Sequence, residues 1–325
     1  MLDTKQDTLL TVVITSYTTE HINDVYELLD SIINQTYKHI ETLFVAERSR
    51  ELYEAIKTYA NEKAMPNIKV IFNEGKPGLS VARNLGITHA NGAIIAFIDD
   101  DAVPFHDWGE SIVKTLVNDS AIGMTGSAYP LWESDSLKWL PEEFYWLISC
   151  TAWTGWKEKH IVRGAFGANM AFKKDAFKSG CLFSPNAGFS EGHRDKPISE
   201  DIEFSLRVRK MTGQNIVFDP DARVWHRVVK RRLGLGFVIQ RSHHIGCTRR
   251  ILRKYYATEL GSYDQERSVL QGMYRLLLSI PKEFFSKPIL AWKKLSITCT
   301  ILVAAAIGYI VPFPGYKLEI ENVKS

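Results

Sequence analysis

The sequence predicts an α/β protein whose central sheet is mostly parallel, with helices on both faces. Apolar, β-branched stretches alternate with amphipathic ones from residue 8 to about residue 104, which is the pattern of strand–helix–strand crossovers. The stretch Ala93–Ile98 is continuously apolar, as expected for a central strand covered on both faces. With 45% hydrophobic and 24% charged residues, the 325-residue chain has the composition of an ordinary globular protein of one or two domains.

The first half of the chain predicts strands and helices in alternation. Strands are expected at residues 8–15, 40–46, 68–72 and 93–98. The helices between them are expected around Val25–Ile33, over residues 50–64, and after Ser80, which fits as an N-cap. Right-handed crossovers through these helices place the strands in one parallel sheet.

The second half of the chain is more mixed. Strands are expected at 121–128 and 167–172, a helix at 199–211, and two short strands at 215–218 and 222–225. Five of the eight tryptophans lie between residues 132 and 156. They could stack on a sugar, lie at a bilayer interface or pack inside the protein, and all three roles stay open.

Three adjacent acids, Asp99, Asp100 and Asp101, follow the strand at 93–98 directly. Ligands of parallel sheets gather at the carboxyl ends of the strands, and neighbouring carboxylates repel one another unless a cation lies between them. Mg²⁺ and Mn²⁺ bind carboxylates together with substrate phosphates. The acids therefore predict a divalent-cation site, with a solvated acidic turn as the alternative.

The C-terminal part of the chain predicts membrane attachment. Leu295–Val311 is 17 residues long without a charge, follows Lys293-Lys294 and precedes Pro312. This length is at the short end for a spanning helix, and we expect a span or an inserted hairpin in place of a buried core helix. The lysine pair would leave the preceding domain on the cytoplasmic side.

Net charge and cysteine spacing indicate which partners and which cellular compartment to expect. The net charge is only +3, so no nucleic-acid partner is expected. Residues 227–254 nevertheless hold nine Lys or Arg and no acid, which suits an anionic membrane, a phosphate-bearing substrate or a solvated helix face. The four cysteines form no CxxC pair, which fits a reducing cytosol without a structural zinc site, and the N-terminus predicts no signal peptide.

Six segments, in order and spacing, resemble family 2 glycosyltransferases, which have the GT-A fold. They are Val12–Tyr17, Leu28–Tyr37, Gly78–Gly86, Ala96–Asp101, Gly167–Lys173 and Ser199–Arg207. The resemblance covers about residues 8 to 230. It implies a GT-A catalytic domain at 1–232. The composition of the remaining chain predicts a basic, amphipathic helical segment at 233–292 and a membrane anchor at 293–325 with one span at about 295–313.

The resemblance implies roles for the acids. Asp99 and Asp101 match the family's metal-binding DxD pair, with Asp100 between them, and would hold Mg²⁺ or Mn²⁺ against the donor diphosphate. Asp201, beside Glu200, matches the catalytic base that activates the acceptor hydroxyl. Acids in the first turn of a helix also complement its dipole, which is the alternative role of this pair.

Other matches lie around the expected nucleotide pocket. Thr15, Ser16 and Tyr17 follow the first strand. Glu47 follows the second, where relatives usually carry Asp-Asp or Asp-Gly. Arg83 matches a donor-side arginine, with a helix-surface charge as the alternative, and His226 matches a histidine that in some relatives completes the metal or diphosphate site. More speculative contacts to the sugar or acceptor are Arg163, Asn169, Trp153 and Trp156.

The resemblance implies inversion at the anomeric carbon. Gln240-Arg241 lacks the tryptophan of the motif found in processive polysaccharide synthases, so we do not expect an enzyme of that branch. The resemblance implies a nucleotide-sugar donor, a UDP-sugar by preference. One C-terminal anchor after a basic, aromatic segment predicts a polyprenyl-linked saccharide as the acceptor. Residues 163–173 and 241–253 are similar to archaeal glucosyl-dolichyl phosphate glucuronosyltransferases. The alternatives are a polyprenyl-phosphate monosaccharide synthase, a nucleotidyltransferase and a non-enzymatic membrane adaptor.

Overall fold

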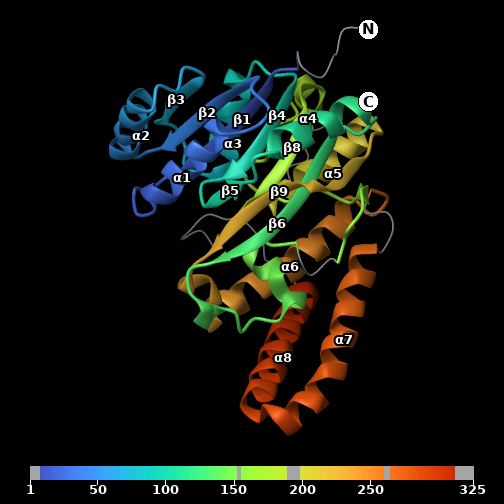
Figure 1. Ribbon diagram of the computed structural model, residues 1–325. Helices are drawn as coiled ribbons and strands as arrows, with labels where there is room; N and C mark the ends of the chain where they lie inside the picture. Colours follow the sequence, from blue (N-terminus) through green and yellow to red (C-terminus); the bar gives the residue numbers. More distant parts are fainter. Residues whose placement is uncertain (1–7, 152–154, 189–197, 260–263, 312–325) are drawn as a thin grey trace.

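The structure, a computed structural model, describes residues 8–151, 155–188, 198–259 and 264–311. An α/β unit with one large sheet occupies the N-terminal two thirds of the chain, and three long helices lie below it in Figure 1. The fold class expected from the sequence is confirmed.

The first half forms the parallel part of the sheet. Its strands are β1 (Leu10–Ser16), β2 (Ile40–Glu47), β3 (Ile68–Asn73) and β4 (Ile94–Asp99), joined by α1 (Ile22–Ile33), α2 (Arg50–Glu62) and α3 (Leu79–His89). They pair in the order β3-β2-β1-β4, and every one of these pairs is parallel. The alternating pattern predicted this arrangement.

The second half extends the same sheet with mixed directions. The strands are β5 (Ala102–Pro104), β6 (Gly123–Trp132), β7 (His160–Val162), β8 (Asn169–Lys173) and β9 (Ile216–Val228). The order continues β4-β8-β6-β9-β5, with β8 antiparallel to both of its neighbours. The helices are α4 (Trp108–Asn118) and α5 (Glu200–Thr212), and short 3-10 turns include η2 (Glu142–Ile148).

Two local expectations were wrong. The residues expected to form two short strands at 215–218 and 222–225 form one strand, β9, which continues through Pro220. The register of its partner β6 shifts between Gly126 and Ala128, and a bulge of this kind accommodates a proline. Ser80 does not cap α3, because the helix begins at Leu79 with Gly78 as its N-cap. The Ser80 hydroxyl donates instead to the carbonyl of Ala187, 3.2 Å away.

Two apolar layers cover the faces of the sheet. Buried side chains of α1, α2 and α4 pack on one face, with Leu28, Ile56 and Trp108 at its centre. Ala82 of α3 and Phe204 of α5 belong to the layer on the other face. This double coverage explains why the central strands are mostly apolar, and it leaves their polar carboxyl ends as the open edge of the sheet.

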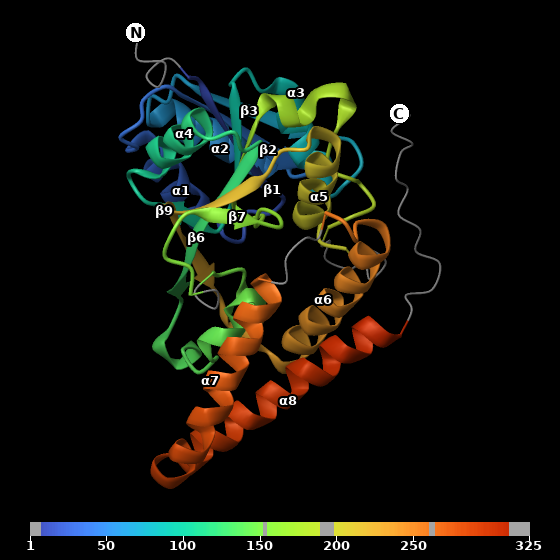
Figure 2. The ribbon, with the colours of Figure 1, turned by 90° about the vertical axis from the view of Figure 1, so that its right-hand side faces the viewer.

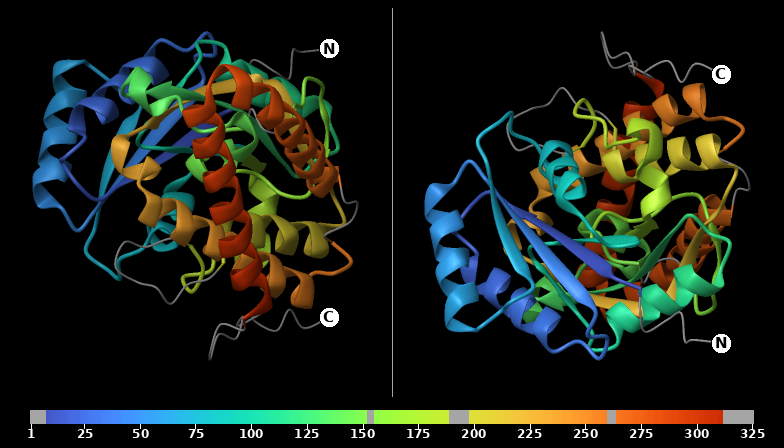
Figure 3. Two further views of the ribbon diagram at one scale, coloured as in Figure 1. Left: turned by 90° about the horizontal axis from the view of Figure 1, so that it is seen from below. Right: turned by 90° about the horizontal axis from the view of Figure 1, so that it is seen from above.

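Helices α6 (Leu235–Tyr255), α7 (Asp264–Ser286) and α8 (Pro288–Ile310) form the lower part of the molecule. In Figure 2, α7 descends from the α/β unit and α8 runs back up beneath α6. Figure 3 shows α8 crossing α6 on the underside. At the crossing the backbones touch: a Cβ added to Gly246 would lie 2.1 Å from the Ala305 carbonyl oxygen, and one on Gly308 would lie 2.1 Å from that of His243.

A third apolar cluster joins these helices to the α/β unit. Val228 at the end of β9 and Phe144 of η2 are packed with Val238 of α6, Met273 of α7 and Ile301 of α8. Trp132, Trp139 and Trp146 pack against this cluster. Three of the five clustered tryptophans therefore have a packing role.

Helix α8 is the described helix with the length and apolar composition needed to cross a bilayer. It starts at Pro288, earlier than expected, and therefore includes Lys293-Lys294 within the helix. One face, with Ile301 and Ala304, is buried against protein, and the other carries Leu302, Val303, Ile307 and Ile310 in exposed positions. The segment boundaries at 232 and 292 stay predictions, and residues 312–313 of the expected span lie outside the described part.

Candidate active site

The carboxyl ends of β1, β2 and β4 meet at one edge of the sheet, as expected for parallel strands. A cavity of about 1890 Å³ opens there. Its lining includes most of the residues expected at the site: Thr15, Ser16, Tyr17, Glu47, Arg83, Asp99, Asp100, Asp101, Arg163, Glu200 and Asp201. Segments far apart in the sequence therefore build a single pocket.

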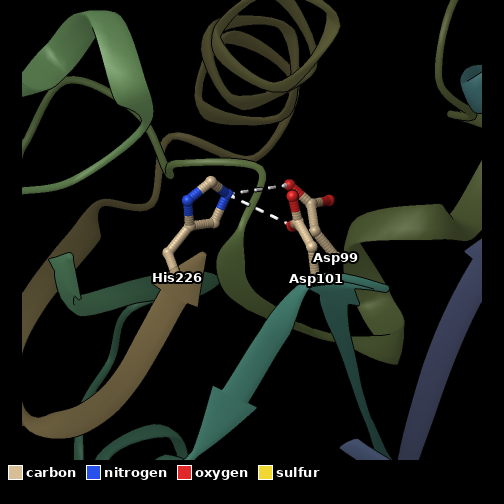
Figure 4. Close-up of side chains that lie close together, drawn as sticks. All are labelled: Asp99, Asp101 and His226. Atoms are coloured by element: carbon tan, nitrogen blue, oxygen red, sulfur yellow. Dashed lines mark ion pairs between the residues drawn. The ribbon is translucent and has the colours of Figure 1, made fainter. Parts of the chain in front are cut away.

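Asp99, Asp101 and His226 form a compact cluster at this edge (Figure 4). Their ligand atoms all lie within 4.8 Å of one another. His226 Nε2 lies 3.4 Å from Asp101 Oδ1 and 4.0 Å from Asp99 Oδ2. Asp99 ends β4, and His226 is brought opposite it because β9 pairs with β5, where Ala102 faces His226.

The cluster fits a divalent cation. Oδ1 of Asp101 is buried and accepts no hydrogen bond from any described residue, so it has a free lone pair. Burial lowers the pKa of His226, which leaves a neutral imidazole nitrogen able to coordinate. Two carboxylates and an imidazole suit Mn²⁺, whereas Mg²⁺ prefers oxygen ligands alone.

The positively charged side chain of Arg232 contacts two of these residues, Asp101 and His226. Its Nη2 donates to Asp101 Oδ2 at 2.6 Å, and its Nη1 lies 3.3 Å from His226 Nε2. Burial raises the pKa of Asp101, but the electrostatic interactions with His226 and Arg232 outweigh burial and hold this pKa below the usual range. Desolvation and the charge of Asp101 raise the pKa of Asp100 to about 7.

Arg83 joins the two acidic parts of the site. It is 2% exposed, and its guanidinium donates to Glu200 at 2.8 Å, to Asp99 at 3.1 Å and to the Gly167 carbonyl at 3.3 Å. A buried charge needs such partners. The alternative of a helix-surface charge is therefore wrong for Arg83.

Glu200 and Asp201, at the start of α5, have different surroundings. Glu200 is buried and accepts a hydrogen bond from Arg83, whereas Asp201 is partly exposed in the cavity. Asp201 Oδ2 accepts from the Gly167 amide and Oδ1 from the Ile202 amide, both at 2.8 Å. These bonds fix the carboxylate, and each oxygen keeps a further lone pair. Asp201 therefore stabilises the first turn of α5 and also lies in the cavity.

Glu47 lies at the end of β2 and accepts from the Gly78 amide at 2.9 Å. That contact holds the loop before α3, where Gly78 has φ 141°, a conformation that favours glycine. Arg48, next to Glu47, has φ 60° and also lines the cavity.

The four residues expected to contact the sugar or the acceptor do not all line the cavity. Arg163 lines the cavity. Asn169 does not: it is 2% exposed, accepts from Trp108 Nε1 at 2.8 Å and donates to the Ala222 carbonyl at 2.7 Å, so its amide holds strands together. Trp156 packs edge-on against Phe218, 5.1 Å between ring centroids, and is also absent from the lining. Trp153 lies outside the described residues.

Sequence reasoning missed the cationic side of the cavity. Arg231, Arg232, Arg241, Arg249 and Arg253 line it, all from the basic stretch 227–254. The signal was present, but the pattern alone does not tell which arginines face inward. Arg227, from the same stretch, pairs with Asp24 at 3.0 Å, and Arg250 donates to the Ile310 carbonyl at 2.6 Å.

Comparison with known proteins gives a consistent picture. The family model described as glycosyl transferase family 2 matches residues 11–181, just over half of the chain. The glucosyl-dolichyl phosphate glucuronosyltransferase of Haloferax volcanii is 26% identical over 93% of this chain and 95% of its own length. Succinoglycan biosynthesis protein ExoM of Rhizobium meliloti is 25% identical over 52% of this chain and 51% of its own.

Among solved structures, a mannosyltransferase from Pyrobaculum calidifontis, in complex with GDP-Man and Mn²⁺, has a similar fold. The TM-score is 0.62 over 93% of this chain and 87% of that chain, at 18% sequence identity. The shared fold, the six segments and the match of the family model agree, and they exclude the adaptor and nucleotidyltransferase alternatives. This chain belongs to glycosyl transferase family 2 and is a glycosyltransferase with the GT-A fold.

Proposed function

We propose that the protein is an inverting, metal-dependent transferase that moves a sugar from a nucleotide diphosphate to a polyprenyl-phosphate-linked saccharide at a membrane. One observation carries this proposal. The cavity that contains Asp99, Asp101 and Asp201 is also lined by Ile301, Leu302 and Ala305 of the apolar helix α8. A single pocket with an acidic end and an apolar wall suits a hydrophilic donor and a lipid-borne acceptor.

Asp99, Asp101 and His226 would hold the cation. When bound there, a cation supplies the positive charge that stabilises the diphosphate as it leaves. Arg83 fixes Asp99 in position, and Glu200 in turn orients Arg83. We assign Glu200 this positioning role in place of a direct part in proton transfer. Mn²⁺ is our choice of ion because of the imidazole ligand.

Asp201 is our choice for the base. Its carboxylate takes the proton of the acceptor hydroxyl as that oxygen forms its bond to the anomeric carbon. The bond from the anomeric carbon to the diphosphate oxygen breaks on the opposite side, and its electron pair leaves with the nucleotide. The two amide bonds to Asp201 hold the carboxylate ready for this transfer.

The donor is best described as a UDP-sugar. Glu47, at the end of β2, has a carboxylate oxygen that can accept from a uracil N–H, with Thr15 and Tyr17 lining the same pocket. A guanine N–H could be bound in the same way, so a GDP-sugar is the second candidate.

Membrane attachment is proposed through α7 and α8. Their exposed apolar side chains include Leu277, Phe285, Trp292 and Ile307, and Phe285 is 95% exposed. A surface of this kind is unfavourable in water and favourable at a bilayer. The name of the Haloferax relative states a dolichyl-phosphate-linked substrate, which supports an acceptor of this class. We place the catalytic unit on the cytoplasmic side, where nucleotide sugars would reach it.

The test is a donor screen with purified protein, Mn²⁺ and lipid extracts, followed by mass analysis of the lipid product. Lipid phosphate and lipid-linked saccharide are offered separately, which separates the proposed function from a monosaccharide synthase. A gain of one sugar on the lipid-linked saccharide is expected. Sugar transfer to the bare lipid phosphate alone would contradict the proposal.

Asp201→Asn should lower the transfer rate by about 10²- to 10⁴-fold, because the amide cannot take up the proton. Nucleotide binding with Mn²⁺ should be retained, since Asp201 is not among the cation ligands. The exposed acid Asp221 provides the control: Asp221→Asn should leave the rate unchanged. Full activity of Asp201→Asn would remove Asp201 from the mechanism.

A further inference from the structure

Helix α6 lines the cavity along most of its length, through Phe237, Gln240, Arg241, His244, Ile245, Thr248, Arg249, Leu252 and Arg253. Five of these residues, Phe237, Arg241, Ile245, Arg249 and Arg253, form a row at intervals of four residues that winds gradually around the helix. At 1.5 Å per residue this row extends about 24 Å along the helix axis. Three of its five members are arginines, so the wall is strongly cationic.

Arg241 is the member of this row closest to the reaction. The charges acting most strongly on it are those of Asp201 and Glu200, ahead of Arg232 and Asp99. It is only partly exposed, and among the residues that the structure describes it makes neither a hydrogen bond nor an ion pair. Burial lowers its pKa, although the two carboxylates oppose this effect. A guanidinium with five donors in such a place calls for an anionic partner.

A second polar group on the same face lacks a partner. His244 lies one turn beyond Arg241 and lines the cavity. Desolvation lowers the pKa of His244 to about 3, so the ring is neutral. Its Nε2 is buried without a hydrogen bond from or to any residue in the described ranges. Two neighbouring groups of α6 are thus left for a ligand.

Helix α8 adds an apolar wall to the cavity. Gly246 brings α8 into contact with α6, and there Ile301, Leu302 and Ala305 join the lining. Leu302 is 47% exposed and lies on the apolar outer face of α8. The cavity therefore reaches the surface that the proposed function places in the membrane.

We propose that Arg241 binds the phosphate of the lipid-linked acceptor, so that the saccharide points to Asp201 and the prenyl chain leaves along α8 past Leu302. This inference rests on the proposed function, in which the acceptor is a lipid-linked saccharide. The cavity is lined by carboxylates, by Arg241 and by apolar side chains of α8, which suit a saccharide hydroxyl, a phosphate and a prenyl chain respectively. The donor diphosphate lies elsewhere, at Asp99 and Asp101.

The test measures binding of farnesyl phosphate, farnesol and inorganic phosphate to the full-length protein in detergent by calorimetry. The wild-type protein should bind farnesyl phosphate most tightly. Arg241→Gln should weaken that binding by about 10- to 100-fold, the value of a charge-assisted hydrogen bond, and leave farnesol binding unchanged. Arg241→Lys should recover part of the loss. Lys254→Gln, an exposed charge of α6 outside the cavity, should have no effect.

Equal loss in Arg241→Gln and Lys254→Gln would overturn the inference, since it would indicate a general charge effect. Inorganic phosphate binding as tightly as farnesyl phosphate would also overturn it. In transfer assays, Arg241→Gln should raise KM for the lipid acceptor and keep KM for the nucleotide sugar. An unchanged acceptor KM in an enzyme that makes the lipid product would refute this inference alone. An enzyme that makes no lipid product with any donor would refute the proposed function.

Discussion

At the scale of residues, the site depends on charges that are paired inside the protein before any substrate arrives. Arg83 connects the end of β4 with the start of α5 by contacting Asp99 and Glu200, and Arg232 contacts Asp101 and His226. The acids of the cavity are therefore held at fixed positions by arginines from α3 and from the segment after β9. Such preorganisation favours electrostatic stabilisation of the leaving group.

Arg83→Met should lower the free energy of unfolding by about 3 to 5 kcal/mol, because it leaves Glu200 buried without its partner. Arg50→Met is the matched control: Arg50 pairs with Glu74 at the surface, where both side chains are more than half exposed, and should cost about 1 kcal/mol or less. Urea unfolding of both variants measures the difference. Equal losses would show that the Arg83 pairs do not stabilise the fold.

Chelation with EDTA should abolish nucleotide binding without lowering the melting temperature. Arg232 already pairs with Asp101, so the fold does not need the cation. Differential scanning fluorimetry with and without EDTA, beside nucleotide binding at increasing Mn²⁺, gives both readings. A fall of several degrees on chelation would show that the cation is a structural element.

At the scale of elements, a feature could be predicted from the sequence where adjacent residues identify it, and could not where contacts with distant segments decide it. The strands β1 to β4 could be predicted because each is a short stretch rich in apolar and β-branched residues between polar loops. β9 could not, since Asp219-Pro220-Asp221 looks like a break, and only the shifted register of β6 allows the strand to continue. The acids at the end of β4 were predicted for the same local reason, because they follow their strand directly.

The arginines of α6 could not be assigned in this way. Which of them faces the cavity depends on the rotation of the helix about its axis. Contacts with α8, remote in sequence, set that rotation. A basic stretch is equally compatible with a solvated face, so the sequence alone left both roles open for Arg241 and Arg249.

The crossing of α6 and α8 makes a testable prediction. Gly246→Ala should destabilise the protein by about 1 to 3 kcal/mol, because the new methyl group would meet the Ala305 carbonyl and the helices must separate. Gly236→Ala, in the same helix but with open space around it, should instead stabilise by up to about 1 kcal/mol. Thermal unfolding in detergent compares the two. A neutral Gly246→Ala would mean that the contact is looser than described.

At the scale of the whole molecule, the catalytic unit and the C-terminal helices share a core. Phe144, Val238, Met273 and Ile301 come from four different elements and pack in one cluster. The boundary expected at residue 232 would cut through this cluster. The contacts of this cluster hold the two parts together beside the cavity.

Cys299 reports on membrane contact. It is exposed on α8, whereas Cys150, Cys181 and Cys247 are buried. In detergent, maleimide should label one thiol per chain. After reconstitution into vesicles, a membrane-impermeant maleimide should leave Cys299 unlabelled, because lipid covers that face. Cys299→Ser is the control and should lose the label in detergent. Equal labelling in vesicles and detergent would place α8 outside the bilayer.

Leu302 belongs to the wall of the cavity and to the exposed apolar face of α8 at once. Under the proposed function, the acceptor arrives and the elongated product departs by sideways diffusion within the lipid sheet, with no need to enter water. Turnover would then follow the number of acceptor molecules per unit of bilayer area, and diluting them with inert lipid would slow the enzyme at a constant bulk concentration.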